Sequence, residues 1–222
     1  MITLRTLNFA IAIWMSSLVF APQPGPNTER VRVLGFDPKT PIERRLEPRD
    51  QVVVIEKDSF PPGLAMNVAQ TFDDALDHAL KHDTVVVAHG LVSGGTLIDG
   101  GTWIRGRVTA SILEVIKSEH WSDRSAPLTF WHNDGELFLK NVRVKAGRYP
   151  IFDPSTRYLL LLGNDESRGL YLGRALRVTA QGILATVLTS TGETQLSTSP
   201  LYGQPLDSVL AALRARQNKR NP

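Results

Sequence analysis

His78 and His82 are the residues of this chain whose types and spacing come nearest to a recognisable chemistry. They lie four positions apart in a segment with helical periodicity, and Asp74 precedes them by one turn. Two imidazole rings and a carboxylate on one helix face could hold a metal ion that activates water for hydrolysis. The histidines that could add a ligand only through the fold are His89, His120 and His132. Because the apolar stripe of the helix lies elsewhere, a solvent-facing pair is the simpler interpretation. We therefore assign no metal, no cofactor and no catalytic residue.

Serine chemistry has less support than metal chemistry. Ser93 or Ser111 would need a histidine, an acid and a local turn such as a nucleophile elbow, and neither serine has that context. The glycine pairs at 94–95 and 100–101 could cradle a phosphate, but no Lys-Ser or Lys-Thr follows either pair. We interpret Ser93 as a turn residue and both glycine pairs as hairpin turns.

Glu114 lies on the apolar face of a predicted strand. Along the strand from Ile104 to Lys117, apolar and polar residues alternate, and the alternation changes phase near Glu114. A carboxyl group on an apolar face can have a raised pKa that suits acid-base catalysis. A β-bulge that turns the side chain outward is the commoner cause of such a change, so we predict a bulge at this point.

A binding site would use the aromatic residues together with two arginines on the polar face of the same strand. Barrel proteins of the oligonucleotide- and oligosaccharide-binding (OB) type often hold oligomeric ligands on an exposed face with aromatic and basic side chains. The alternative is that the rings belong to the core and the arginines to the solvent. The residues concerned are Trp103, Trp121, Trp131, Tyr149, Tyr171, Arg105 and Arg107.

The composition is that of a folded, cysteine-free protein with little net charge. Of 222 residues, 42% are hydrophobic and 21% are charged, as in ordinary globular domains. The net charge is +3, and loss of residues 1–21, which contain Arg5 and no acid, leaves 24 basic and 22 acidic side chains. So small an excess excludes nucleic acid as the expected partner. The lack of cysteine excludes disulfides and thiolate catalysis.

Residues 1–21 have the pattern of a signal peptide. Arg5 precedes an apolar run from Phe9 to Val19, and Ala21 occupies a small-residue position suited to cleavage. Pro22 follows directly and is unfavourable for signal peptidase, so the segment is either removed or kept as an N-terminal membrane anchor. Either outcome predicts an extracytoplasmic protein, periplasmic or secreted.

Two helices are predicted on either side of a region rich in short strands. The first runs from Phe72 to Lys81 with Thr71 as its cap, and the second from Pro205 to Arg216, with apolar residues on one face and a basic tail after it. Residues 22–66 read as a proline-rich linker with one possible edge strand at 51–56.

The region between the helices alternates strands with turns, which favours a barrel or a sandwich. Asp134-Gly135 is a strong hairpin signal, and the glycines at 169, 173 and 182 separate short strands. We therefore predict a mainly β protein with a small antiparallel OB-like barrel, an N-terminal helix and a C-terminal helix. The predicted strands lie at 84–88, 104–117, 128–131, 136–144, 158–162, 170–172, 176–179 and 183–187.

The order of these elements resembles that in a broad group of uncharacterised bacterial exported proteins. The resemblance is carried by the Val-Val-Val strand after the helix, Glu114-Val-Ile-Lys117, Tyr149-Pro-Ile-Phe152 and Arg157-Tyr-Leu-Leu-Leu-Leu162. Their shared core is similar to the OB-like barrel of netrin modules and tissue inhibitors of metalloproteinases. Ser118 and Ser155-Thr156 replace glycines of that pattern, and the absence of cysteine excludes inhibition through an N-terminal cysteine.

The sequence thus predicts four parts: a signal peptide or anchor at 1–21, a linker at 22–66, the barrel domain at 67–200, and the C-terminal helix and tail at 201–222. The expected function is non-enzymatic binding or interaction at the bacterial cell envelope, with an unknown protein or cell-envelope ligand as partner. The alternative is an extracytoplasmic metal-assisted hydrolase built around His78 and His82.

Overall fold

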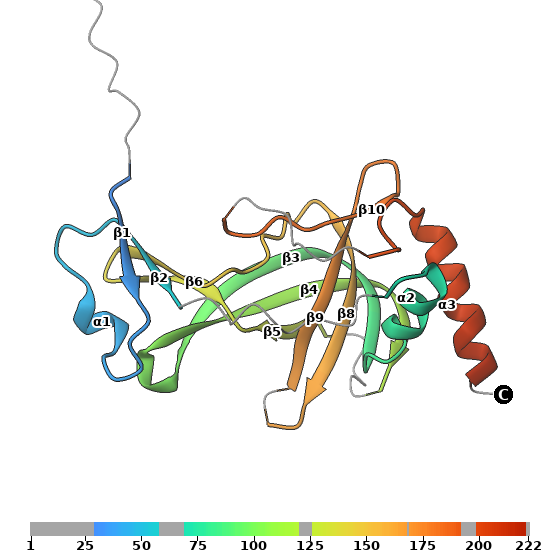
Figure 1. The fold of residues 1–222 in the computed structure, drawn as a ribbon, viewed down its shortest axis with the longest axis horizontal. Coiled ribbons are helices and arrows are strands. Elements are labelled where there is room, and N and C mark those ends of the chain that lie inside the picture. The colour runs from blue at the N-terminus through green and yellow to red at the C-terminus, as the bar shows by residue number, and fades with distance from the viewer. Residues whose placement is uncertain (1–28, 58–68, 120–125, 168, 192–198, 221–222) are drawn as a thin grey trace, which may run out of the picture.

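The computed structural model describes residues 29–57, 69–119, 126–167, 169–191 and 199–220. Within these ranges the chain is mainly β, with a closed five-stranded barrel, a second sheet of four strands, and two helices beside the barrel (Figure 1). The predicted signal peptide or anchor at 1–21 lies outside the described residues, as do His120 and Trp121. None of the helices in the described ranges is long and apolar enough to cross a membrane.

A long hairpin of β3 (Thr84–Ile98) and β4 (Trp103–Ser118) runs along the molecule and joins its two parts (Figure 1). The strands turn at Asp99–Gly101, where all three residues have positive φ, a region open to glycine and tolerated by aspartate. The turn predicted at 94–95 is wrong, because β3 continues through both glycines and pairs there with β4.

The barrel is mixed, whereas the sequence predicted an antiparallel one. Its strands follow the order β3, β4, β5 (Leu128–His132), β9 (Gly169–Val178) and β8 (Arg157–Asp165), and β8 pairs back with β3. Every neighbouring pair is antiparallel except β5 and β9, which run parallel. Parallel neighbours need a long connection, and here the chain leaves the barrel after β5 and builds part of the second sheet before it returns.

The interior of the barrel contains part of the apolar face of β4, while Ile104 of that face packs in the core of the second sheet. Val108 and Ala110 of β4 are buried in one cluster with Tyr158, Leu160 and Leu162 of β8. The last three belong to a strand that is buried on both faces, because its other side chains face the helices. The two segments therefore line one common interior.

Phe152 packs into the cluster of side chains inside the barrel. Its ring packs edge-on against Tyr158 at 5.2 Å and against Phe130 at 6.3 Å between ring centroids. The hydroxyl of Tyr158 also accepts a hydrogen bond of 2.8 Å from the backbone N–H of Asp153. A ring contact and a backbone contact thus attach the segment after Tyr149 to the barrel interior.

The predicted bulge near Glu114 is confirmed. The pairing of β3 with β4 changes register on both sides of the Val87–Glu114 pair. The change frees the Glu114 carboxylate to form an ion pair with Arg214 of the C-terminal helix. The bulge thus converts an apparently apolar-facing acid into a surface contact.

Strand β9 is continuous, although the sequence predicted two short strands separated by Gly173. A Cβ at Gly173 would lie 2.4 Å from Cε1 of His82, so this glycine makes room for the imidazole ring instead of forming a turn. The following strand, β10 (Leu184–Ala185), is short and pairs with the end of β9.

The second sheet has the strand order β1 (Val31–Gly35), β2 (Val52–Glu56), β7 (Val142–Ala146) and β6 (Gly135–Leu139). Strand β2 is the segment predicted as an edge strand, and it lies inside this sheet between two parallel neighbours. Helix α1 (Ile42–Arg45) connects β1 to β2. Residues 29–57, read from the sequence as mostly linker, therefore contribute half the strands of a sheet.

The hairpin predicted at Asp134-Gly135 is wrong, since β5 belongs to the barrel and β6 to the second sheet. The segment predicted as one strand at 136–144 is itself a hairpin, which turns at Lys140 and Asn141 with φ of 50° and 68°. Asparagine tolerates this left-handed backbone, which suits a two-residue hairpin.

Glycines allow β6 to cross the long hairpin closely. A Cβ at Gly95 would lie 2.2 Å from the carbonyl oxygen of Glu136, and a Cβ at Gly135 would lie 2.9 Å from the nitrogen of Gly106. No larger side chain fits at either crossing. The second sheet packs on the far end of the hairpin through Val53, Ile55, Trp103, Ile104 and Val144.

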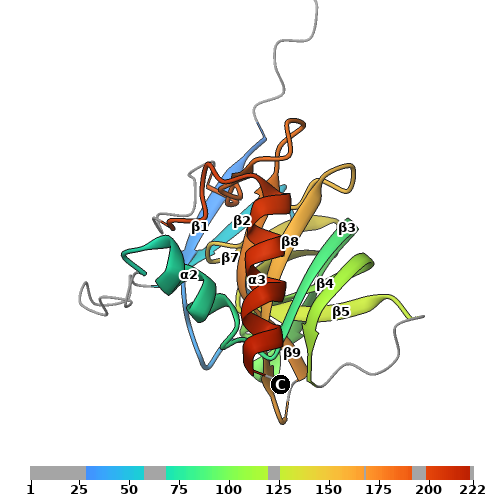
Figure 2. The same ribbon diagram turned by 90° about the vertical axis from the view of Figure 1, so that its right-hand side faces the viewer.

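Two helices cover the outer face of β3, β8 and β9 (Figure 2). Helix α2 (Phe72–Ala79) begins with a capping box in which Thr71 and Asp74 exchange hydrogen bonds, and it ends two residues before the predicted end. Helix α3 (Leu206–Arg220) buries the predicted apolar face. The members of that face are Leu206, Val209, Leu210 and Leu213.

Candidate functional site

His78 lies in the last turn of α2, but the helix ends at Ala79, so His82 lies beyond it and the two histidines do not share a helix face, contrary to what the spacing predicted. The rings meet edge-to-face with centroids 5.5 Å apart. The Asp74 carboxylate, however, accepts hydrogen bonds from the hydroxyl and the backbone N–H of Thr71, so it serves the helix cap. Among the described residues no group of three or more potential metal ligands is found.

The surroundings of the pair are also unfavourable for a cation. Burial and then the charges of Arg174 and Lys81 lower the pKa of His78. Burial, followed by His78 and Arg174, lowers the pKa of His82 to about 4. The positive charge of Arg174 would oppose a metal ion as it opposes a proton. The structure gives His82 a packing role over Gly173, and the exposed His78 rests edge-to-face on the His82 ring.

The end of β5 separates two cavities because its side chains alternate between the faces of the strand. Trp131 lines one cavity and His132 the other. We call the first the seam cavity, since it lies where β5 meets β9. We call the second the junction cavity, since it lies between the barrel and the second sheet.

The seam cavity has a volume of about 210 Å³. Trp131 of β5 is paired with Tyr171 of β9, and Arg105 comes from β4. The side chains that line the cavity are Arg105, Trp131, Asn133, Asp165 and Tyr171. Two aromatic rings, a guanidinium, an amide and a carboxylate thus meet on the outer side of the barrel.

Local contacts position the two rings of the seam cavity. The Tyr171 ring lies over Gly163 of β8, where a Cβ would come within 2.3 Å of the ring carbon Cζ. Even so, Tyr171 is 46% exposed. The guanidinium of Arg107 lies 5.6 Å from the centre of the Trp131 ring, at cation–π distance. Asp165 accepts hydrogen bonds from the backbone and hydroxyl of Ser167, which orients its carboxylate.

The structure brings together part of the predicted aromatic set. Arg105, Trp131 and Tyr171 meet in the seam cavity, with Arg107 beside them. Trp103 is instead a core residue: it packs edge-on against Phe36, and its indole N–H donates to the carbonyl of Asn133. Tyr149 lies in the junction cavity, and Trp121 is outside the described residues.

Sequence reasoning missed Asn133 and Asp165 as partners of this site. Asn133 directly precedes the predicted turn at Asp134-Gly135, and nothing in the local pattern around Asp165 distinguishes it from a loop acid. Asn133 immediately follows β5, and Asp165 ends β8. Their positions beside Trp131 and Tyr171 become visible only when β5 is paired with β9.

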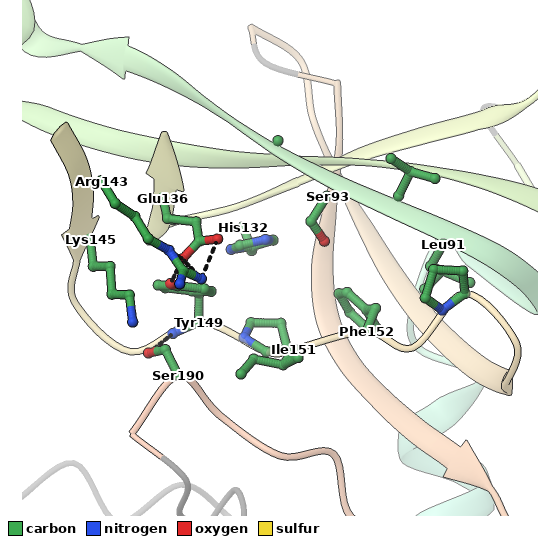
Figure 3. Close-up of a pocket in the computed structure, with 15 residues that line it drawn as sticks. Leu91, Ser93, His132, Glu136, Arg143, Lys145, Tyr149, Ile151, Phe152 and Ser190 are labelled. Atoms are coloured by element: carbon green, nitrogen blue, oxygen red, sulfur yellow. Dashed lines mark hydrogen bonds and ion pairs between the residues drawn. The ribbon is translucent and has the colours of Figure 1, made fainter. Parts of the chain in front are cut away.

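The junction cavity has a volume of about 300 Å³ and is shown in Figure 3. Its polar wall is organised by Glu136, whose carboxylate accepts two-pronged hydrogen bonds from Arg143 and a further one from the hydroxyl of Tyr149. Burial alone would raise the pKa of Glu136, but the bonds from Tyr149 and Arg143 outweigh it and lower the pKa. Burial and the neighbouring Glu136 raise the pKa of Tyr149, so its hydroxyl keeps its proton.

His132 is the least satisfied polar side chain of the junction cavity. Its ring is 9% exposed and stacks on Tyr149 at 6.3 Å between centroids with an interplanar angle of 18°. Neither ring nitrogen has a hydrogen-bond partner. Burial lowers its pKa to about 4, although the backbone of Asp134, whose contact with the ring is too poor in geometry for a hydrogen bond, acts in the opposite direction. Such a buried, unpaired group costs about 1–3 kcal/mol of stability and can be relieved by a ligand.

The serines considered as nucleophiles lie apart from each other. Ser93 lines the junction cavity, and its hydroxyl points into the space beside His132 (Figure 3). Ser111 is exposed on β4 next to Gly90. Because the nitrogens of His132 are unpartnered, Ser93 and His132 do not form the hydrogen bond that activates a serine.

A scan against models of protein families and a search of curated proteins both gave no match for this chain.

Proposed function

We propose that this protein is an extracytoplasmic, non-enzymatic binding protein that holds a glycan of the bacterial cell envelope in its seam cavity. The observation that carries the proposal is the convergence of Arg105, Trp131 and Tyr171 from three different strands on one cavity of about 210 Å³. The export signal expected at 1–21 supports the location.

The chemistry of the cavity fits a sugar. Aromatic rings offer flat apolar surfaces that suit the C–H faces of a pyranose ring, and each ring has few rotatable bonds to restrict. Arg105, Asn133 and Asp165 supply donors and acceptors for hydroxyl and acetamido groups. A surface with both signs of charge and two rings suits a neutral polymer better than a polyanion.

The position of the cavity on the barrel also supports the proposal. OB-type barrels bind oligosaccharides and oligonucleotides on the face of their second and third strands, with help from the loop between the fourth and fifth. The corresponding elements here are β4, β5 and the turn between β8 and β9, which place Arg105, Trp131 and Asp165 at the cavity. Of the two polymer classes, the near-neutral charge of the chain favours the glycan.

The alternative, a metal-assisted hydrolase at His78 and His82, is less well supported by the geometry. Asp74 is committed to the cap of α2, and Arg174 lies close enough to lower the pKa of both histidines. The non-enzymatic proposal therefore rests on the better assembled of the two sites.

Co-sedimentation with purified peptidoglycan sacculi tests the proposal. We expect the wild-type protein to sediment with sacculi and Trp131→Ala to remain mostly in the supernatant, because loss of a stacking ring weakens binding by about 1–2 kcal/mol, or about 5- to 30-fold. Phe138→Ala is the matched control, since it removes a 71% exposed ring from β6 in the second sheet. Equal sedimentation of all three proteins, or none by the wild type, would refute the proposed ligand.

A further inference from the structure

Beyond the proposed glycan site, we infer that the junction cavity is a second, independent site, which binds a small organic carboxylate with an apolar body. It lies on the opposite face of β5 from Trp131 and shares no lining residue with the seam cavity. The ligand class follows from three features of its wall: an unpaired histidine, one uncompensated positive charge and an apolar half.

The unpaired histidine calls for a hydrogen-bonding ligand. His132 is nine-tenths buried, both of its ring nitrogens are without partners, and it borders the cavity beside Ser93. Its ring cannot turn freely, because it stacks on Tyr149 and lies over Gly106, where a Cβ would be 1.9 Å from the ring. A neutral imidazole N–H and a serine hydroxyl are two donors suited to one carboxylate.

The ionised side chains that line the cavity favour a ligand with one negative charge. Glu136 neutralises Arg143 through the two-pronged pair and also accepts a hydrogen bond from Tyr149. Lys145 lies opposite Glu136 on β7 and lines the same cavity. The ionised groups that line the cavity therefore sum to one positive charge. A dianion would leave one charge uncompensated in a partly enclosed space, which is costly.

The other half of the cavity is apolar. Leu91 and Val92 come from β3, while Ile151, Phe152 and the flanking prolines come from the segment between β7 and β8. Figure 3 shows Leu91, Ile151 and Phe152 on this side of the cavity. Ile151 is 51% exposed, so it lies near the solvent and can pack on a ligand. An apolar ligand body placed here would cover surface that otherwise faces water.

The test uses the full chain and phenylacetate, a small carboxylate with an aromatic body, together with its neutral amide, phenylacetamide. Binding is followed through the ring C–H resonance of His132 in NMR spectra. We expect phenylacetate to shift this resonance saturably and phenylacetamide to bind at least about ten-fold more weakly, because the amide lacks the charge that Lys145 and His132 favour.

Two variants locate the site. Lys145→Met should weaken phenylacetate by about five-fold and leave phenylacetamide unchanged, whereas Lys81→Met, which removes an exposed lysine next to α2, should change neither. His132→Phe keeps the stacking ring without its nitrogens and should weaken phenylacetate; if this variant does not fold, the lysine pair still decides the outcome. Trp131→Ala should leave phenylacetate binding intact, which separates this site from the glycan site.

Three results would overturn the inference: no saturable shift of His132, equal affinity for the acid and the amide, or the same effect from Lys81→Met as from Lys145→Met. None of these results bears on sedimentation with sacculi, so the two proposals can fail separately.

Discussion

Trp131 on β5 is paired with Tyr171 on β9 across the parallel seam that closes the barrel. The same two rings line the seam cavity. The residues proposed to contact the glycan are therefore held by the backbone pairing that completes the barrel, and Gly163 beneath Tyr171 supplies the space for its ring. A site built on strands in this way is expected to be largely formed before the ligand arrives.

Gly163→Ala should weaken glycan binding with little effect on stability. The new Cβ would meet the Tyr171 ring at 2.3 Å, and because this ring is half exposed it can swing out of the cavity. Gly173→Ala on the neighbouring strand is the control, since its Cβ would meet His82 instead. Calorimetric titration with a glycan fragment and thermal melting of both variants measure the two effects. Similar binding losses in both variants would argue against a role for Tyr171.

Gly106→Ala should destabilise the protein. Its Cβ would lie 1.9 Å from the ring of His132, which is buried and stacked on Tyr149 and so has little room to move. Overpacking of this kind costs about 1–3 kcal/mol. Gly94→Ala on β3, where nothing lies within 4 Å of the new Cβ, is the control. Urea denaturation of the two variants gives the comparison, and equal stability would show that His132 is free to move.

The stability of the protein should fall as the pH is lowered from about 6.5 to 4, partly because of His132. Burial lowers the pKa of His132 from 6.5 to about 4 in the folded state. Between these values the unfolded chain binds a proton that the folded chain does not, so the free energy of unfolding decreases as the pH falls. The shift corresponds to at most about 3 kcal/mol, fully lost below pH 4.

The variant His132→Phe isolates this contribution, because it keeps a stacking ring that cannot be protonated. His82, whose pKa is also lowered to about 4, would still titrate in the variant. Urea denaturation at several pH values between 4 and 7 should therefore show a shallower pH dependence for the variant than for the wild type. Parallel curves would mean that His132 is not buried in its neutral form.

Glu136 and Tyr149 should be energetically coupled. The Tyr149 hydroxyl donates to a carboxylate that is also held by Arg143, and hydrogen bonds to charged groups are stronger than neutral ones. A double-mutant cycle with Glu136→Ala and Tyr149→Phe, followed by urea denaturation, should give a coupling of about 1–2 kcal/mol. If the effects of the two changes on the free energy of unfolding are additive, the hydrogen bond between Tyr149 and Glu136 does not contribute to stability.

Local patterns in the sequence were sufficient for the elements whose partners are near in the chain. Thr71 caps α2 as predicted, the apolar face of α3 is buried as expected, and the alternation along β4 agrees with the burial of Val108 and Ala110 in the barrel. In each case spacing alone determines which side chains face the core.

The errors concern pairings between distant segments. Asp134-Gly135 has the composition of a hairpin turn but lies where the chain passes from the barrel to the second sheet, and Gly94 and Gly95 lie within a strand. A glycine in the sequence can mark either a turn that needs its backbone freedom or a strand position where a neighbouring segment leaves no room for a Cβ. The sequence alone does not distinguish these two cases. The second sheet was missed because β2 pairs with β7, about 90 residues later in the chain, and no local signal marks such a partner.

The candidate site also combines residues that the sequence could select with a strand pairing that it could not predict. Trp131, Tyr171 and Arg105 could be selected by residue type, but only the parallel pairing of β5 with β9 brings them together. The junction cavity was not predicted, because the isolated His132 and the motif beginning at Tyr149 gave no sign that their rings stack.

Calorimetric titration with a tetramer of N-acetylglucosamine tests glycan binding at the seam cavity most directly. The proposal predicts saturable binding by the wild type and by Phe138→Ala, with affinity reduced about 5- to 30-fold in Trp131→Ala. An isotherm for Trp131→Ala that overlays the wild type, or no heat of binding from the wild type, would contradict it.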